Sequence, residues 1–228
     1  RLVDENEPVA DIVADPVAAA ERQESATHPK IPMPHALYGK RRPNARGVDL
    51  ADIRELDALA KGMREADQRG WRAAPLIGGE RVDSNSKPIS VKSPANTEQT
   101  VGEVVWASEK DIDRALDLAS KAADRWSATA GAERADCLRR YADLLEEHTA
   151  ELVALCAREA GKHIPDGIAE VREAVDFCRY YACQVEDEFN GDYVLPGPTG
   201  ERNTYRLDGR GVFVCICPWN FPLAIFPG

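Results

Sequence analysis

Apolar residues recur at every third or fourth position in several stretches of the chain, which is the spacing of one buried face of an α-helix. Residues 49–70 show this pattern and end at a glycine, as helices commonly do. A second helix is predicted after Ser108, because a carboxylate three residues later, at Asp111, completes a capping box that satisfies free backbone N–H groups. Its apolar stripe consists of Ile112, Ala115, Leu116, Ala119, Ala122 and Trp126.

Two longer helices are predicted in the middle of the chain. The first covers residues 131–160, with a break near His148 and Thr149, and Gly161 is placed to end it. The next begins near Pro165, since a proline is tolerated in the first helical turn. Apolar stripes of this kind are most often core, so their residues receive no functional role here.

Strand patterns occupy the remaining apolar stretches. Short β-type runs at 76–79 and 100–106 flank a turn-rich stretch, and residues 191–207 form a hairpin around the turn PGPTGE. The run 212–217 is continuously apolar and is bounded by Gly211 and Pro218, which fits a strand buried on both faces of a parallel sheet. Helices followed by a buried strand indicate the α/β class.

The composition restricts the partners and the compartment. The formal charge of −10 and the pI near 5.0 argue against nucleic acid or an anionic membrane, because such partners need a basic footprint. The basic run at 40–42 is too short to change this and reads as part of a solvated linker covering residues 21–48. No stretch reaches the roughly 20 apolar residues of a membrane span, and the acidic start is unlike a signal peptide. We therefore expect a cytoplasmic location.

Cysteine and histidine usage gives no sign of a metal or disulfide framework. The six cysteines show no CxxC spacing and read as buried, reduced thiols. The four histidines are scattered, so no metal site is predicted. The chain begins without methionine and ends directly after an apolar run, and we interpret both ends as cuts within a longer protein.

The candidate chemistry lies directly after the predicted buried strand, in the segment Cys217-Pro218-Trp219-Asn220-Phe221-Pro222. Ligands of open α/β sheets bind at the carboxyl ends of the strands, and two prolines restrict this backbone. An asparagine amide held in this way can donate a hydrogen bond to an oxygen that becomes an oxyanion. The alternative is an asparagine that only caps a following helix.

Four ordered segments resemble the aldehyde dehydrogenase superfamily: GEVVWASEKDIDRALDLASKAADRW, ERADCLRRYADLLEEHTAELVALCAREAGK, AEVREAVDFCRYYA and PWNFPLAIF. Together with HPKIPMPHALYG and the acidic RLVDEN they resemble the bifunctional proline utilization A family, which joins a proline dehydrogenase to an L-glutamate γ-semialdehyde (1-pyrroline-5-carboxylate) dehydrogenase. The resemblance implies the N-terminal part of an aldehyde dehydrogenase (Rossmann-like NAD-binding) domain at 76–228, incomplete and preceded by an extended linker. Residues 1–35 would be the C-terminal tail of the proline dehydrogenase part, and 36–75 a linker with a helix.

The resemblance also implies roles for individual residues. Asn220 corresponds to the oxyanion-hole asparagine, which steadies the thiohemiacetal oxygen formed when a cysteine attacks the aldehyde. The strand end that lines the nicotinamide side of NAD corresponds to Ile216, Cys217, Pro218 and Trp219. Phe221 corresponds to an aromatic wall of the aldehyde pocket. Glu170 is a candidate for a carboxylate near the substrate, with a solvated helix-surface glutamate as the alternative.

The family's cysteine nucleophile and general base lie downstream of this motif, so the resemblance implies a parent enzyme that uses NAD and a fragment that is inactive alone. FAD would belong only to the missing proline dehydrogenase part. The parent is expected to bind a small-molecule substrate and to form a homo-oligomer. A second hypothesis is a truncated, non-catalytic assembly module that pairs through the hairpin 191–207. An unrelated helical domain would require the four ordered matches to be coincidence.

Overall fold

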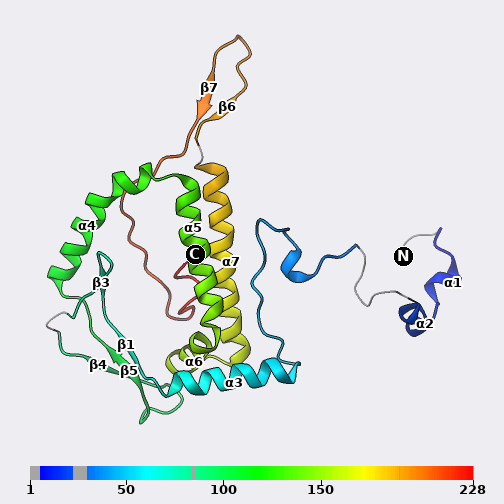
Figure 1. Cartoon of the computed structure of the whole chain (residues 1–228), viewed down its shortest axis with the longest axis horizontal. Coiled ribbons are helices and arrows are strands. Elements are labelled where there is room, and N and C mark those ends of the chain that lie inside the picture. The colour runs from blue at the N-terminus through cyan, green and yellow to red at the C-terminus, as the bar shows by residue number, and fades with distance from the viewer. Residues whose placement is uncertain (1–5, 23–29, 84–85, 190, 228) are drawn as a thin grey trace.

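The computed structural model describes residues 6–22, 30–83, 86–189 and 191–227. Two short N-terminal helices, α1 (Val9–Ile12) and α2 (Pro16–Glu21), lie away from the rest of the molecule and contain no buried residue (Figure 1). α2 begins where the Asp15 side chain accepts the N–H of Val17 and a proline occupies the first turn. α2 therefore depends on local capping rather than on packing, whereas α1 has no side-chain cap.

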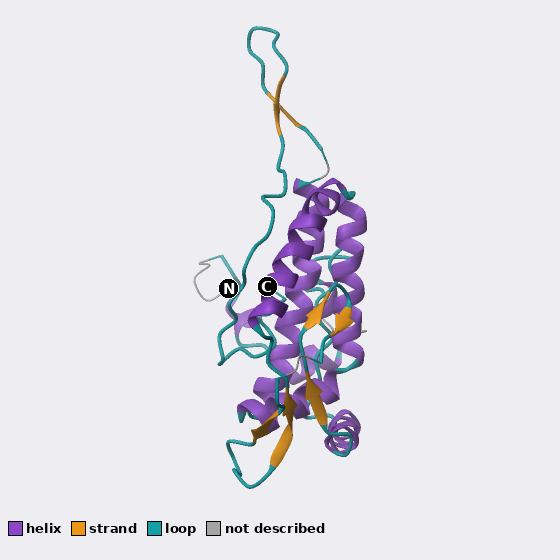
Figure 2. Cartoon of the chain, turned by 90° about the vertical axis from the view of Figure 1, so that its left-hand side faces the viewer, coloured by secondary structure: helices purple, strands orange, loops and turns teal. Residues whose placement is uncertain are grey.

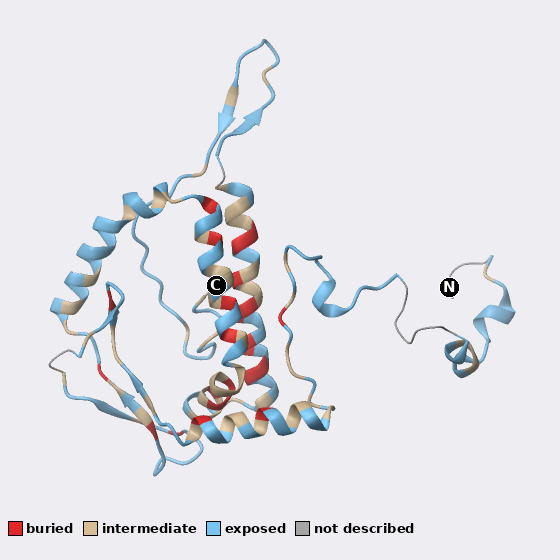
Figure 3. Cartoon of the chain, in the orientation of Figure 1, coloured by how far each residue is buried: buried red, intermediate tan, exposed pale blue. Residues whose placement is uncertain are grey.

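The centre of the molecule is a helical bundle of α5 (Gly131–Glu147), α6 (Thr149–Ala160) and α7 (Ile164–Glu188). α5 and α7 lie side by side, and α3 (Ile53–Asp67) packs on α6 at their lower end (Figures 1 and 2). Figure 3 shows the buried residues concentrated along this bundle. Its core consists of Ala45, Leu59, Ala142, Leu145, Val153, Ile168, Val171, Ala174, Val175 and Cys178.

The helices of the bundle begin and end where the sequence predicts. α5 ends and α6 begins around His148, as predicted, and Gly161 ends α6 in the left-handed conformation with φ of 68°. Pro165 lies in the first turn of α7. The predicted helix at 49–70 is confirmed as α3, which begins where Asp52 accepts the N–H of Arg54.

A small three-stranded sheet lies beside the bundle in the order β1-β5-β4. β1 (Trp71–Ala73) is parallel to β5 (Thr100–Val104), and β4 (Ile89–Lys92) is antiparallel to β5. β4 lies in the stretch predicted to be rich in turns, where no strand was expected, so the prediction missed this strand. A four-residue strand gives little periodic signal, and β4 is defined by its pairing with β5.

A separate two-stranded ribbon joins β2 (Leu76–Ile77) to β3 (Glu80–Arg81). Gly78 and Gly79 connect these strands with φ of 66° and 83°. Two positive φ values at consecutive loop positions are the requirement of a tight hairpin turn that matches the strand twist, and glycine meets it without steric cost. The predicted β-type run at 76–79 is therefore a strand and its turn.

α4 (Glu109–Ala128) begins with the predicted capping box. The Ser108 hydroxyl accepts the N–H of Asp111, and the Asp111 carboxylate accepts the N–H of Ser108 at 2.8 Å. The predicted burial of its apolar stripe is wrong, however, because no residue of α4 is buried and Trp126 is half exposed. Within the described ranges β2 contacts α4, but Ile112 and Leu116 stay exposed on that face as well.

The C-terminal part of the chain first extends away from the bundle as a hairpin and then returns toward it. The predicted hairpin is confirmed as β6 (Tyr193–Leu195) paired antiparallel with β7 (Asn203–Tyr205), and it projects beyond the end of α7 (Figures 1 and 2). Residues 212–227, which we call the C-terminal segment, then return toward the bundle (Figure 1). The predicted buried strand at 212–217 is wrong, because these residues are exposed and none of the described strands pairs with them. An extended segment becomes a buried strand only when neighbours bond its backbone and cover its faces.

Residues 40–48, which we call the connector, run along the bundle. Arg41 is exposed, as predicted for a solvated linker, but it also donates to Glu186 at 3.3 Å and to Asp187 at 2.7 Å. Ala45 is buried, and its N–H donates to the Asp176 carboxylate at 2.7 Å. The connector is therefore fixed to α7 through charged side chains whose positions the sequence pattern did not reveal.

Candidate functional site

The predicted chemistry lies on the C-terminal segment, where residues 219–225 form consecutive turns. Asn220 and Trp219 are exposed, whereas Ala224 is completely buried. Leu223 packs against the bundle core, and its carbonyl accepts the N–H of Phe226 at 3.2 Å. The segment thus has one anchored end, and it presents the Asn220 amide at the surface three residues before that anchor.

Glu170 makes the anchor from the side of α7. It shares the buried face of the helix with Gly167, Val171 and Ala174, which are its neighbours at helical spacing. Only 2% of the residue is exposed, so the alternative of a solvated glutamate is wrong. Its Oε2 accepts the backbone N–H of Leu223 at 3.1 Å and of Ala224 at 2.7 Å. These are the charge-assisted hydrogen bonds that a carboxylate makes with consecutive amides.

Lys162 supplies the opposite charge. Gly161 turns the chain out of α6 in the left-handed conformation, and the next N–H, of Lys162, donates to the Cys156 carbonyl at 3.3 Å. The Lys162 ammonium then lies 2.6 Å from Glu170 Oε1 and 5.2 Å from the centre of the Phe221 ring. One lysine therefore contacts both the buried carboxylate and the aromatic side chain beside Asn220.

We call Lys162, Glu170 and the backbone of 223–224 the anchor unit. An unpaired buried carboxylate is strongly disfavoured. Here the Lys162 ammonium neutralises the Glu170 carboxylate, and the backbone N–H groups of 223–224 hydrogen-bond it. Cys156 lies close enough for its titration to be affected: burial, and after it the negative charge of Glu170, raise the pKa of this thiol to about 11. Cys156 therefore stays protonated at neutral pH and is not a nucleophile, since only the thiolate attacks.

The residues predicted to face the cofactor lie just before the anchor unit. Ile216 is 92% exposed and Trp219 is 89% exposed, with Cys217 exposed and Pro218 half-buried between them. They form a continuous stretch with exposed apolar and aromatic surface on both sides of a rigid proline. Such a surface fits a flat heteroaromatic ring and offers backbone groups for hydrogen bonds.

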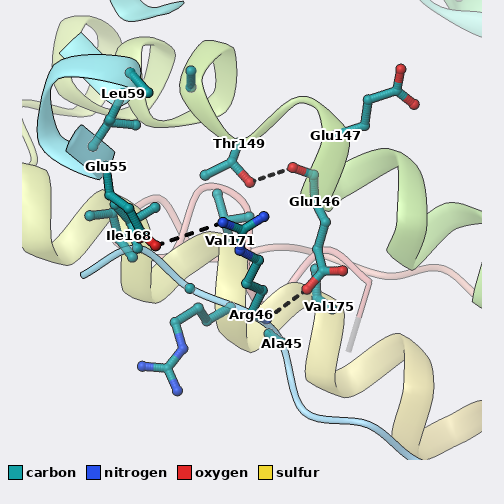
Figure 4. Close-up of a pocket in the computed structure, with 15 residues that line it drawn as sticks. Ala45, Arg46, Glu55, Leu59, Glu146, Glu147, Thr149, Ile168, Val171 and Val175 are labelled. Carbon is teal, nitrogen blue, oxygen red and sulfur yellow. Dashed lines mark hydrogen bonds and ion pairs between the residues drawn. The ribbon is translucent and has the colours of Figure 1, made fainter. Parts of the chain in front are cut away.

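A cavity of about 460 Å³ lies elsewhere, between the connector, α3 and the bundle (Figure 4). Arg46 closes one side, where its N–H donates to the Glu146 carboxylate at 2.7 Å and its guanidinium lies 3.7 Å from Glu55. Leu59 and Val171 supply apolar wall. None of the residues predicted to act on substrate or cofactor lines this cavity, which is formed by the docking of the connector.

The described part of the chain offers no candidate metal centre. Within it, no group of three or more histidine, cysteine, aspartate or glutamate residues could hold a metal ion. All six cysteines are free, and Cys137, Cys215 and Cys217 are exposed, so the prediction of buried thiols is wrong for half of them. None of the described helices is long and apolar enough to cross a membrane.

Sequence reasoning selected Asn220, Phe221 and Glu170, and the structure brings Glu170 within hydrogen-bonding distance of the segment that carries the other two. It missed Lys162 and the backbone amides of 223–224. The usable signal was the position of Glu170 beside an apolar stripe, because a charge at the edge of a buried helix face requires a partner if it is buried. The sequence alone could not say which of the many lysines and arginines is that partner.

Comparisons with known proteins point to one family. The model of the aldehyde dehydrogenase family matches residues 81–227. The bifunctional protein PutA of Escherichia coli strain K12 is 41% identical over the whole chain, which spans 17% of that relative. The 1-pyrroline-5-carboxylate dehydrogenase 2 of Bacillus subtilis strain 168 is 36% identical over 79% of this chain and 35% of its own length.

A crystal structure of 1-pyrroline-5-carboxylate dehydrogenase from Thermus with bound NAD has a similar fold. It superposes with a TM-score of 0.73 at 32% identity, covering 81% of this chain and 36% of that chain. The chain thus spans about a sixth to a third of the relatives that it matches. The domain boundaries predicted at residues 35 and 75 stay predictions.

Proposed function

Because the chain belongs to the aldehyde dehydrogenase family, we propose that the protein that contains it oxidises L-glutamate γ-semialdehyde (1-pyrroline-5-carboxylate) to L-glutamate with NAD. Relatives named for this dehydrogenase activity, at 36% and 32% identity, support the substrate. The match of the whole chain to a bifunctional protein supports an upstream proline dehydrogenase part, to which FAD would belong. The predicted fold class is confirmed by the family match and by the superposed structure.

The observation that carries the proposal is the position of Asn220. Its side chain is exposed on a turn, and the backbone three and four residues later is fixed to a buried carboxylate. A preorganised amide of this kind can donate a hydrogen bond to the aldehyde oxygen as negative charge develops on it. Such a donor stabilises the transition state more than the ground state, and it therefore raises kcat.

NAD would be held beside this donor by residues 216–219. The exposed Ile216 and Trp219 offer apolar surface, and Pro218 keeps the backbone between them restricted. When bound, NAD supplies the hydride acceptor for the oxidation. The chain's own contribution is to present this surface next to the Asn220 amide, so that the reacting groups approach in one orientation.

Phe221 would form a wall of the aldehyde site, and its ring is fixed in part by the Lys162 ammonium. A direct contact of Glu170 with substrate stays a prediction. Both of its carboxylate oxygens have protein partners, so a role through Phe221 and the backbone of 223–224 fits its position better. All six thiols being free agrees with the proposed cytoplasmic location.

The test is an assay of NADH formation with γ-semialdehyde, using the product of the complete coding frame. Asn220→Ala is expected to lower kcat by about 100-fold or more, the usual cost of one lost oxyanion donor. Asn96→Ala, which changes an exposed asparagine in a distant turn, is the matched control and should keep wild-type activity. Activity that is indifferent to Asn220→Ala would contradict the assignment.

The hairpin β6–β7 favours a second candidate, a module for assembly into a homo-oligomer. The hairpin projects beyond the bundle (Figures 1 and 3). Val194 and Leu195 are exposed on it. A short exposed ribbon with apolar side chains can pair with another subunit by strand addition. Val194→Lys should then lower the oligomeric state measured by sedimentation. If the module serves assembly alone, the product of the complete coding frame should form the oligomer without forming NADH.

A further inference from the structure

We propose that Glu170, together with Lys162, is a positioning residue for the oxyanion donor Asn220. The inference rests on the function proposed above and adds to it the groups that set where the Asn220 amide lies. Glu170 belongs to α7 and Lys162 to the turn after α6, so two bundle elements act on a segment more than fifty residues away in sequence. This role does not require either side chain to touch the aldehyde or the cofactor.

The geometry of the anchor favours positioning. Glu170 Oε2 accepts two consecutive N–H groups, at 3.1 and 2.7 Å, and two bonds from adjacent residues fix the direction of the backbone as well as its distance. Asn220 lies three residues before the first of them, within the same series of turns. A change of about 1 Å at the anchor would therefore reach the amide, and a displacement of that size can cost about 100-fold in rate.

Charge explains why a carboxylate rather than a neutral side chain holds this position. The Glu170 side chain is 2% exposed and its Lys162 partner 20% exposed, so water screens their interaction little. A buried ion pair is favourable only when its geometry is good and its remaining atoms are hydrogen-bonded. Here one oxygen takes the ammonium at 2.6 Å and the other takes the two amides, so both charge and hydrogen-bonding capacity are used.

The same ammonium extends the control to the side chain next to Asn220. It lies 5.2 Å from the Phe221 ring centre, within the range of a cation–π contact. Phe221 is thereby linked to Glu170 through one lysine, while Leu223 and Ala224 are linked to it directly. The two links reach the segment on the C-terminal side of Asn220, and Pro218 restricts its backbone on the other side.

The experiment compares Glu170→Gln with wild type in the complete enzyme, with steady-state kinetics on γ-semialdehyde and NAD. Loss of positioning acts on the transition state, so kcat should fall about tenfold, part of the effect of removing the donor, while KM for the aldehyde changes less than twofold. Glu173→Gln, three residues further along α7 at an exposed position, is the matched control and should match wild type. A raised KM with an unchanged kcat would indicate substrate binding and would overturn the proposal.

A double-mutant cycle with Asn220→Ala separates positioning from a general structural effect. If Glu170 acts through Asn220, Glu170→Gln should lower kcat less than twofold in the Asn220→Ala background. An equal loss in both backgrounds overturns the inference. Should Glu170→Gln give an enzyme that no longer binds NAD, Lys162→Gln replaces it in the cycle, because it keeps the acceptor bonds of Glu170. Additivity of Lys162→Gln with Asn220→Ala would then be the overturning result.

The two proposals fail in different ways. The absence of NADH formation by wild type removes the dehydrogenase function and the positioning role with it. An active enzyme that is indifferent to Asn220→Ala keeps the function but removes the oxyanion role of Asn220, and the positioning role with it. An active enzyme that loses about 100-fold on Asn220→Ala, but in which Glu170→Gln behaves like Glu173→Gln, keeps the function and removes only the positioning role.

Discussion

The helical bundle and the C-terminal segment are both rich in apolar residues, but they differ in what their sequence achieves alone. Val153 and Val175 in the bundle are completely buried, whereas Val214 and Ile216 in the C-terminal segment are exposed. The bundle helices bond their own backbones and need only each other to cover an apolar stripe. Residues 212–217 have no such internal hydrogen bonding, and the C-terminal segment is attached to the bundle further along, at 223–224. Burial therefore reflects the availability of partners more than hydrophobicity.

The largest expected difference between the two regions is in stability. Val153→Ala should lower the free energy of unfolding by about 2 kcal/mol, because it leaves a cavity in a fully packed site on α6. Val214→Ala removes the same atoms from an exposed position and should change it by less than about 0.5 kcal/mol. Urea denaturation followed by circular dichroism measures both, and equal effects would break the comparison.

α4 sharpens the comparison, because it is a helix without a buried residue. Its stability then depends on local signals, so Ser108→Ala should destabilise its first turn by about 1 kcal/mol. Hydrogen exchange of the amides at 109–112 measures the effect. Ser120→Ala, at an exposed position within the same helix, should leave exchange unchanged or slow it, since alanine is the better helix former. A fully protected first turn in Ser108→Ala would show that packing, rather than the cap, holds α4.

The smallest effect concerns the ion pairs on the bundle surface. Hydrogen bonds from Arg139 hold the pKa of Glu186 below its ordinary value. A lowered folded-state pKa stabilises the protein above the unfolded value of about 4.3, and this stabilisation is lost as pH falls through the folded pKa. The difference between wild type and Glu186→Gln should be within about 1 kcal/mol near neutral pH and should shrink in acid. A difference that grows on acidification would contradict the assigned sign.

Much of the helical architecture could be predicted because its signals are local. The capping box at Ser108, the break at His148 and the left-handed Gly161 are each visible within a few residues. The strands were harder to predict from the sequence. β4 becomes a strand by pairing with β5, and the apolar run 212–217 fails to become one because nothing in the described chain pairs with it.

The candidate site also contains residues that the sequence could select and residues whose role only the tertiary structure revealed. Asn220 could be selected from its two flanking prolines and from the resemblance of PWNFPLAIF to one family. Glu170 was ambiguous in sequence, since a glutamate beside an apolar stripe can lie on either side of the boundary between core and solvent. Its burial, its Lys162 partner and its bonds to the 223–224 backbone follow from how α6, α7 and the C-terminal segment meet.

The sequence by itself therefore determined the helices, their caps and the family to which the chain belongs, because helical hydrogen bonds and family motifs are formed by residues close in the chain. Tertiary structure decided which apolar faces are covered, which charges are paired and how the Asn220 turn is held. Those outcomes depend on contacts between residues far apart in sequence, and a linear pattern shows that a buried charge needs a partner without showing which residue supplies it.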